Sequence, residues 1–187
     1  MNVAVRTRMT LEEFLAWERP QERKWEFDGR SPVEMPGGTH NHAVLQGNLN
    51  YSLVGLLRGS ACRFLGSEMK LLAANRIRYP DGMILCTPVP GKALMVEAPV
   101  VVFEILSDST QSIDRVDKNA EYRAVPSIQR YVMLEQDRIA ATVFQRIGAH
   151  WLGHLLTAGD TLSLPEAAID LPLAALYEGV ELPPIPA

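Results

Sequence analysis

The segment covering residues 100–106, with the sequence VVVFEIL, constrains the fold of this chain more than any other. Six of its seven residues are apolar, which is typical of a β-strand that is covered on both faces of its sheet. Residues 128–134 have the character of a second buried strand. Strands that are buried on both faces need other layers packed against each side, so these segments predict an α/β protein.

Two helical segments supply those layers. Apolar residues recur at helical spacing from residue 42 to about residue 58, and a second helix is predicted over residues 114–124, where Val125-Pro126 ends it. The order of elements is helix, three strands, helix, strand, which predicts a mixed β-sheet with a helix on each side. The three strands between the helices are predicted at residues 68–73, 76–86 and 100–106.

Further elements extend this core toward both ends of the chain. Thr10 and Glu13 predict the capping box of a short N-terminal helix, and Asp28-Gly29 predicts the turn of a hairpin that follows it. A C-terminal hairpin is predicted about Gly148. We therefore expect a single domain over residues 1–187, with its core at about residues 25–145.

Composition narrows the classes of protein to which the chain can belong. The net charge of −4 and the pI of about 5.6 argue against a protein that coats DNA, but not against an enzyme with a local basic groove. Because no apolar run reaches the ~18 residues of a membrane span and the first residues lack a signal-peptide core, we expect a cytoplasmic protein without membrane contact. Cys62 and Cys86 are expected to be small buried hydrophobic residues.

Two carboxylates lie in apolar surroundings. Glu104 interrupts residues 100–106, where burying an unpaired charge is costly, although a glutamate near a strand end can also face solvent or form a salt bridge. Asp81 follows Pro80, and Pro-Asp-Gly is also a common turn. A strand that carries Asp81 into a pocket beside Glu104 accounts for both residues. Two carboxylates so close need a divalent cation or a shared proton, and their oxygens suit Mg²⁺ or Mn²⁺.

Lys118 is the third candidate residue, because it lies one loop and one helical turn after the strand that carries Glu104. Asp114, Lys118 and Tyr122 share one face of the predicted helix, so the lysine can reach back over the strand end. Its charge there could stabilise a scissile phosphate. A helical lysine in isolation is usually solvated, and at the helix surface it is expected to contribute little to stability.

These residues resemble the PD-(D/E)XK nuclease signature with its lysine displaced onto the following helix. The chain is more closely similar to the Uma-two (Uma2) family of restriction-endonuclease-like proteins, over roughly residues 10–175. The stretches that carry this resemblance are Trp25-Glu-Phe-Asp-Gly-Arg, Met35-Pro, His42, Tyr79-Pro-Asp, Val102-Phe-Glu-Ile-Leu-Ser-Asp-Ser-Thr, Asp117-Lys118 with Tyr122, and Ile128-Gln-Arg-Tyr-Val.

The resemblance implies a restriction-endonuclease-like core and hydrolysis of DNA phosphodiester bonds with Mg²⁺ or Mn²⁺. It implies that Lys118 is the catalytic lysine, because Leu106 stands where the textual signature has a lysine. The metal ligands that it implies are Asp81, Glu104, the backbone carbonyl of Ile105 and, unless it is a surface residue of its hairpin, Glu26.

Substrate contacts and assembly are less constrained by the sequence. His42 heads the long helix, where phosphate is attracted, and is a candidate for binding DNA together with Tyr122 and Arg123, with capping or packing as the alternative for His42. A homodimer is expected, because two sites related by a two-fold axis cut a duplex most simply, and the N-terminal helix and the hairpin beyond residue 139 offer apolar surface.

Two other functions stay open at this point. The first is a catalytically inactive protein of the same fold that binds nucleic acid or a protein partner, although Asp81, Glu104 and Lys118 are all intact. The second is an interaction protein in which the carboxylates merely pair with arginines.

Overall fold

The computed structural model describes residues 8–35, 37–106 and 113–184, and within these ranges all side chains except those of residues 113–115. Its centre is a six-stranded sheet of mixed direction, in which two central strands are parallel and all other neighbours are antiparallel. The strands lie in the order β11 (His150–Thr157), β10 (Ala140–Ile147), β9 (Arg130–Leu134), β8 (Val101–Ile105), β6 (Gly82–Leu85) and β3 (Arg63–Gly66), with β8 and β9 parallel.

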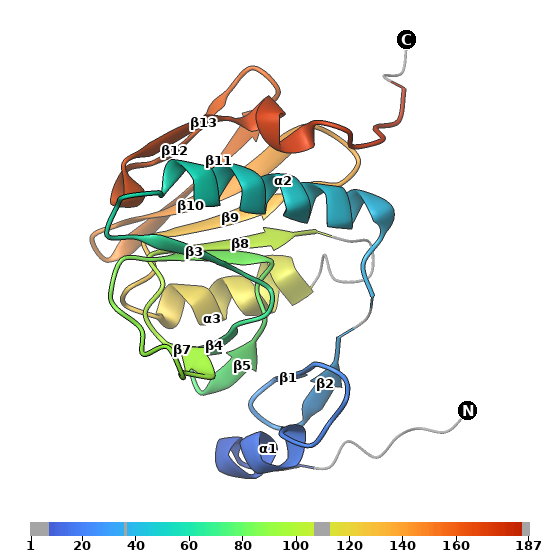
Figure 1. Ribbon diagram of the computed structural model, residues 1–187, viewed down its shortest axis with the longest axis vertical. Helices are drawn as coiled ribbons and strands as arrows, with labels where there is room; N and C mark the ends of the chain where they lie inside the picture. Colours follow the sequence, from blue (N-terminus) through green and yellow to red (C-terminus); the bar gives the residue numbers. More distant parts are fainter. Residues whose placement is uncertain (1–7, 36, 107–112, 185–187) are drawn as a thin grey trace.

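A helix covers each face of this sheet (Figure 1). Helix α2 (His40–Leu56) lies on one side, and the π-helix η1 (Ile113–Lys118) runs directly into helix α3 (Asn119–Ala124) on the other. All five residues of β8 are buried, and they alternate between the two sides. Phe103 and Ile105 pack in the cluster that contains the α2 leucines, whereas Val102 packs in the cluster that contains Tyr122. The predicted strand with two covered faces is therefore confirmed.

The strand predicted over residues 76–86 is wrong in one respect, because the structure divides it between two sheets. Its first part is β5 (Arg76–Arg78), and its second part is β6 of the central sheet. Pro80 lies between the two parts and has no backbone N–H to donate to a ladder, so a continuous strand cannot pass through it. Asp81 thus stands at the point where the chain crosses from one sheet to the other.

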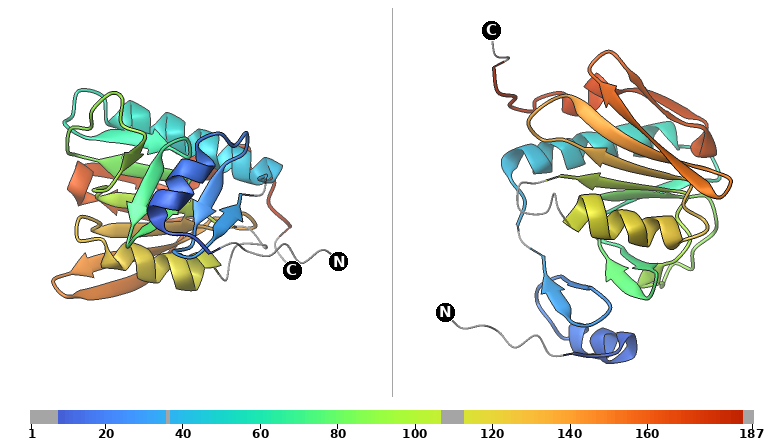
Figure 2. Two further views of the ribbon diagram at one scale, coloured as in Figure 1. Left: turned by 90° about the horizontal axis from the view of Figure 1, so that it is seen from below. Right: turned by 180° about the vertical axis from the view of Figure 1, so that it is seen from behind.

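The second sheet brings the N-terminal segment to the core. Its strand order is β2 (Pro32–Glu34), β1 (Trp25–Phe27), β5, β4 (Lys70–Ala73) and β7 (Met95–Val96). Helix α1 (Leu11–Glu18) lies beside the β1–β2 hairpin (Figure 2) and begins with the predicted capping box of Thr10 and Glu13. Phe14 of α1 packs against Phe27 of β1, so the apolar face of this helix is used inside the fold.

The C-terminal segment adds two hairpins, of which the sequence predicted one. Strands β10 and β11 pair about Gly148, as predicted. A second hairpin, β12 (Thr161–Leu164) with β13 (Ile169–Pro172), was not predicted, and the 3₁₀ helix η2 (Pro165–Ala167) forms its turn. The chain continues in the 3₁₀ helix η3 (Leu173–Tyr177), whose buried residues join the α2 cluster. Among the described residues, no helix is long and apolar enough to cross a membrane.

Cys62 and Cys86 form a disulfide that joins the residue before β3 to the residue after β6. Cys62 is buried, as expected, but the bond between the two cysteines was not predicted. The sequence separation of 24 residues gave no sign of the pairing, because it results from the antiparallel register that sets Arg63 opposite Leu85. Residues 107–110 of the Uma-two resemblance, Ser-Asp-Ser-Thr, lie outside the described residues.

Gly82 should not tolerate a side chain. A Cβ atom at this position would overlap the ring of Phe64 and lie 3.2 Å from Cδ2 of Leu49. We expect Gly82→Ala to lower the free energy of unfolding by about 1–3 kcal/mol in urea denaturation, the usual cost of overpacking. Gly47→Ala on α2, where a Cβ meets nothing within 4 Å, is the control and should stabilise by up to about 1 kcal/mol. Equal stability of the two variants would contradict this assignment.

The fold should lose stability in alkali. Burial raises the pKa of Tyr177, whose hydroxyl donates to the carbonyl oxygens of Ala140 and Glu135, so the folded chain retains a phenol proton that the unfolded chain releases above about pH 10. The free energy of unfolding then falls as the pH rises beyond 10, by up to about 1.4 kcal/mol per pH unit for this group. Urea titrations from pH 9 to 11 should show a shallower fall in Tyr177→Phe than in Tyr51→Phe, since Tyr51 is 85% exposed.

Candidate active site

An open pocket of about 790 Å³ lies where the end of β8, the first half of α2 and the segment around β1 and β2 meet. Asp81, Glu104 and Lys118 all line it, together with Ile105 and His42. The structure therefore brings the predicted carboxylate pair and the predicted lysine to one place, although they come from different elements. The other side of the pocket is formed by residues next to the N-terminal hairpin, among them Arg23 and Lys24.

Asp81 is buried and held by three donors. The register that pairs Gly82 with Phe103 sets Asp81 beside Glu104 on the neighbouring strand. Its Oδ2 accepts a hydrogen bond of 2.7 Å from the backbone N–H of Ile105. Its Oδ1 lies 3.1 Å from Nε2 of His42 and accepts a bond of 3.3 Å from the amide of Gln46. Both α2 and β8 therefore fix the orientation of this carboxylate.

Glu104 is only 4% exposed, so the alternative of a solvent-facing glutamate at the strand end is wrong. Its Oε1 accepts hydrogen bonds from the hydroxyl of Tyr122 at 2.7 Å and from Nζ of Lys118 at 3.0 Å. Burial, and secondly the charge of Glu104, raise the pKa of Tyr122, which keeps its phenol protonated as a donor. Both of these donors compensate the carboxylate of Glu104 in its buried surroundings.

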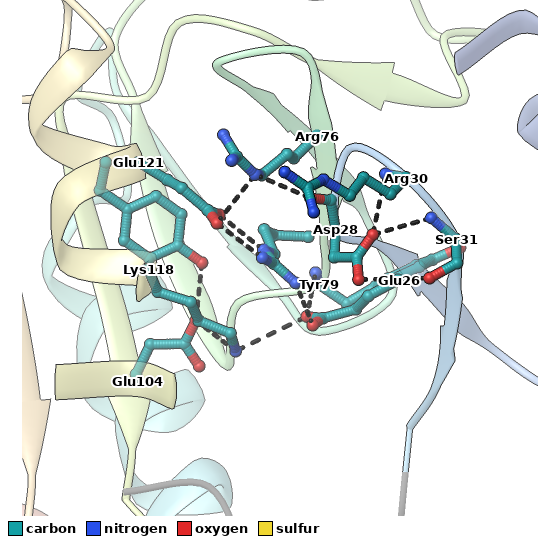
Figure 3. A network of polar contacts seen from close by, with 11 residues as sticks. Glu26, Asp28, Arg30, Ser31, Arg76, Tyr79, Glu104, Lys118 and Glu121 are labelled. Atoms are coloured by element: carbon teal, nitrogen blue, oxygen red, sulfur yellow. Dashed lines mark hydrogen bonds and ion pairs between the residues drawn. The ribbon is translucent and has the colours of Figure 1, made fainter. Parts of the chain in front are cut away.

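Lys118 lies between two carboxylates (Figure 3). Besides its contact with Glu104, its Nζ lies 3.6 Å from Oε1 of Glu26, which β1 contributes. Lys118 is 7% exposed, and the expected helix-surface lysine is therefore wrong. The reason is that the side chain of Lys118, at the end of η1, extends to Glu104 of β8 and to Glu26 of β1. Glu26 is also 7% exposed, so the alternative of a surface residue in its hairpin is wrong.

The ion pairs continue beyond Glu26. Nη1 of Arg78 donates to Oε2 of Glu26 at 2.9 Å, while its Nε and Nη2 donate to the two oxygens of Glu121, each at 2.7 Å. The backbone N–H of Tyr79 also donates to Glu26, at 3.2 Å. A chain of alternating charge therefore runs from α3 through β5 and β1 to Lys118 and Glu104, and all of its side chains are buried.

The three candidates for substrate contact have different surroundings. His42 lines the pocket. Its imidazole does not cap helix α2, because the side chain of Thr39 caps the helix by accepting from the backbone N–H of His42. Tyr122 has no exposed surface and holds Glu104 instead of a substrate. Arg123 stacks over Phe144 at 4.5 Å from the ring centroid, because it lies one residue, about 100° of helix, away from the face of Tyr122. The predicted DNA contact of Tyr122 is therefore wrong, because this residue is fully buried, whereas that of Arg123, which is partly exposed, stays a prediction.

Three residues of this site were missed by sequence reasoning. Gln46 follows His42 by four residues and so shares its helix face, which is a signal that could have found it. Glu121 similarly follows Lys118 by three residues. Arg78 carried no such signal, because a charged residue that alternates with Ile77 in a strand is normally solvated. Its burial depends on Glu26 and Glu121 arriving from distant parts of the chain.

The carboxylate and carbonyl oxygens at the pocket suit a hard divalent cation that binds the protein through only a few ligands. Among the described residues, no three His, Cys, Asp or Glu side chains are grouped so that they could hold one ion. Mg²⁺, however, usually retains several waters and binds through one or two carboxylates together with substrate oxygens. Asp81, Glu104 and the carbonyl of Ile105 offer such a set at an open pocket.

Comparison with known proteins places the chain in a family. A family model named Uma2 and described as "Putative restriction endonuclease" matches residues 11–175. The chain belongs to the Uma2 family. It is 28% identical to the uncharacterized protein slr1290 of Synechocystis sp. (strain ATCC 27184 / PCC 6803 / Kazusa), over 92% of this chain and 93% of that protein. It is 27% identical to sll1609 of the same organism, also uncharacterized, over 81% of this chain and 89% of the relative.

A solved structure has the same fold. It is a crystal structure described as a putative nuclease belonging to DUF820 from Anabaena variabilis ATCC 29413, and the match has a TM-score of 0.74 at 18% sequence identity. The match covers 91% of this Uma2 chain and 98% of that one. At this identity the likeness concerns the fold alone, and it confirms the predicted nuclease-like α/β architecture.

Lys118 should matter for stability as well as for chemistry. Lys118→Met removes the buried cation that compensates Glu104 and Glu26, and breaking a buried pair usually costs about 3–5 kcal/mol. We expect a loss of about 3 kcal/mol in the free energy of unfolding at pH 7, measured by urea denaturation. Lys92→Met, at an exposed position, is the control and should change it by less than about 0.5 kcal/mol. Indistinguishable stabilities would mean that the Lys118 ion pairs contribute nothing.

Proposed function

We propose that this Uma2 protein is a metal-dependent endonuclease that hydrolyses DNA phosphodiester bonds, with Asp81, Glu104 and Lys118 as its catalytic residues. The observation that carries the proposal is the meeting of two buried carboxylates and a buried ammonium at one open pocket. The family match and the fold support the broader class of nuclease. Burying these charges costs stability, which is the pattern expected of residues kept for function.

Asp81, Glu104 and the carbonyl of Ile105 would hold the cation, Mg²⁺ or Mn²⁺. When bound, the cation polarises the phosphate and lowers the pKa of a water molecule. The protein's part is to orient the ligands, which His42 and Gln46 do for Asp81 and Tyr122 does for Glu104. Such supporting hydrogen bonds are a regular feature of metal-ligating carboxylates.

Lys118 supplies the fixed positive charge. In a partly water-excluded pocket, an oriented ammonium stabilises the negative charge that develops on the phosphate more strongly than it would in water. We assign Glu26 to holding this ammonium and not to the metal shell, because Asp81 and Glu104 line the pocket, whereas Glu26 is not among the residues that line it and its Oε1 lies 3.6 Å from Nζ of Lys118. Glu26 is thus a positioning residue in this proposal.

The outer side of the pocket fits a phosphate backbone. Arg23 and Lys24 line it and form ion pairs with exposed carboxylates, those of Glu34 and Glu68. Exposed ion pairs contribute little to stability, so a phosphate can replace the carboxylate at small cost. This local basic edge reconciles an acidic chain with a polyanionic substrate. His42 is the candidate for a direct contact near the reacting phosphate.

A cleavage assay tests the proposal. Purified protein is incubated with supercoiled plasmid and with single-stranded DNA or RNA, in Mg²⁺, Mn²⁺ or EDTA. We expect cleavage of DNA that requires the cation and that Glu104→Gln, which keeps the shape of the side chain, abolishes. Lys118→Met should cut at least about 10²-fold more slowly, the scale of losing one electrostatic stabiliser, provided circular dichroism shows it folded.

Calorimetry with Mn²⁺ separates the assigned roles. Glu104→Gln should lose affinity for the ion, whereas Lys118→Met should bind it equally or slightly more tightly, because a nearby positive charge is gone. Glu26→Gln should retain the affinity while cleaving more slowly. Cleavage by Lys118→Met at the rate of Lys92→Met would remove Lys118 from the mechanism.

The main alternative is a catalytically inactive protein of the same fold that binds nucleic acid or a partner. It predicts DNA binding in gel-shift experiments without cleavage under any metal condition, and no change of binding in Glu104→Gln. The reading in which arginines neutralise the carboxylates is less favoured, since Arg78 pairs with Glu26 and Glu121, and Glu104 pairs with Lys118.

We also propose a homodimer. The two surfaces suggested for it by the sequence differ in the structure. Helix α1 packs Phe14 into the fold, where no part of its ring is exposed. The β10–β11 hairpin does leave apolar side chains in solvent, at Ile147, Leu152 and Leu155.

A further inference from the structure

Strand β11 is an unprotected sheet edge. It forms the outer edge of the six-stranded sheet, and the paired register with β10 is unbroken over all eight residues (Figure 2, orange hairpin). Its sequence, HWLGHLLT, contains no Lys, Arg, Asp, Glu or Pro. Six of the eight residues are exposed, among them Leu152 at 55% and Leu155 at 62%.

The other edges of the two larger sheets all carry features that block edge-to-edge pairing. The opposite edge of the same sheet, β3, is four residues long and begins with an exposed arginine. In the second sheet, β2 has three residues including a proline and a glutamate, and β7 has two residues. Natural edge strands are normally kept short, charged or interrupted by proline for this purpose. The departure at β11 therefore points to a strand that pairs with another.

Two hydrogen bonds of the neighbouring strand β10 show which backbone groups of β11 point outward. The N–H of Arg146 and the carbonyl of Ala140 bond away from β11, to Gln129 and Glu135. Their partners in the register, Trp151 and Thr157, must therefore direct their own groups outward. The alternation adds Gly153 and Leu155. Thr157 is occupied, because its N–H donates to Asp160 and its carbonyl accepts from Asp160.

We propose that the occupant of this edge is β11 of a second copy of the chain, paired antiparallel about Gly153. In this register Gly153 faces Gly153 of the partner subunit, and Leu155 faces the partner's Trp151 across about six backbone hydrogen bonds. On the other side of the sheet, Leu152 faces the partner's His154. The Gly153 pair lies on the two-fold axis and every other pairing occurs twice, and none sets two carboxylates or ammonium groups against each other, so the strand is complementary to itself.

Two observations favour a second copy over another strand. Apolar side chains lie on both sides of the edge, and in this register Leu155 covers an aromatic ring, a combination that stabilises cross-strand pairs. The ring of Trp151 is already held in place by Arg146, whose guanidinium lies 4.5 Å from its centroid. The chain's net charge of −4 would oppose self-association elsewhere on its surface, but β11 carries none of that charge.

The dimer has a defined geometry. Antiparallel pairing of two identical strands places the two-fold axis perpendicular to the sheet, so the two six-stranded sheets become one continuous sheet. The pocket at the end of β8 then recurs at the opposite end of the partner's sheet. Each pocket would then contact its own stretch of nucleic acid, and the two active sites need not lie at the same position of one duplex. This consequence alone rests on the proposed function.

The experiment measures the mass of the full chain in solution from 1 to 100 µM by light scattering and sedimentation. We expect about twice the chain mass of 20.7 kDa. Leu155→Pro removes the outward N–H and should leave the hairpin intact, because edge prolines are tolerated where the N–H faces solvent. It should weaken dimerisation at least 100-fold. Leu56→Lys, which replaces an apolar residue 51% exposed on α2, is the control and should remain dimeric.

Hydrogen exchange provides a readout that does not depend on activity. The amides of Trp151, Gly153 and Leu155 should be protected at high protein concentration and exchange quickly on dilution or in Leu155→Pro. A monomer at 100 µM, or a dimer that Leu155→Pro leaves unchanged while circular dichroism shows it folded, would overturn the proposal. Cleavage per protomer should be equal in Leu155→Pro and wild type, so absence of cleavage in both refutes the nuclease function without touching the dimer.

Discussion

The structure depends on one buried ammonium that two carboxylates share from different sheets. Glu104 belongs to the central six-stranded sheet, Glu26 belongs to the five-stranded sheet, and Lys118 of the helix between them contacts both. Burying the charged form of Glu104 depends on this cation, because an uncompensated buried charge is very costly, whereas Glu26 is compensated by Arg78 as well. The N-terminal hairpin is therefore part of the site and not an appendage. The position of this hairpin and the orientation of Lys118 depend on each other through Glu26.

The crossing of the chain from one sheet to the other explains how Asp81 meets donors from two elements. Pro80 prevents a continuous strand, and Asp81 directly after it is free of ladder constraints on one side while its neighbour Gly82 is fixed against Phe103. The carboxylate can then accept the N–H of Ile105 and the imidazole of His42 at once. A residue in the middle of a regular strand could not meet donors from both β8 and α2.

Sequence reasoning reached the central sheet, its two helices and the triad of Asp81, Glu104 and Lys118, because each is marked by a local pattern. A continuous apolar run, helical periodicity and a misplaced charge can all be seen within a dozen residues. It failed for Arg78 and for the Cys62–Cys86 disulfide, whose partners are set by long-range register. It also proposed a substrate contact for Tyr122 and a small effect of Lys118 on stability, since the periodicity of a helix does not show how deeply it packs on a sheet.

The proposed displacement of the catalytic lysine from the strand to the helix has a physical reason in this fold. Leu106 has the same parity along the chain as Glu104 and packs, 1% exposed, in the apolar cluster that contains Val102 and Tyr122. A lysine at position 106 would have to place its charge in that cluster, whereas Lys118 approaches Glu104 from the side open to the pocket. The position on the helix also gives the ammonium a second partner in Glu26. A lysine at position 106 would have to extend past Glu104 to reach that partner. The distance in sequence between Glu104 and Lys118 thus follows from where the fold offers carboxylate partners to a buried ammonium. A search for a lysine two residues after Glu104 would not find Lys118.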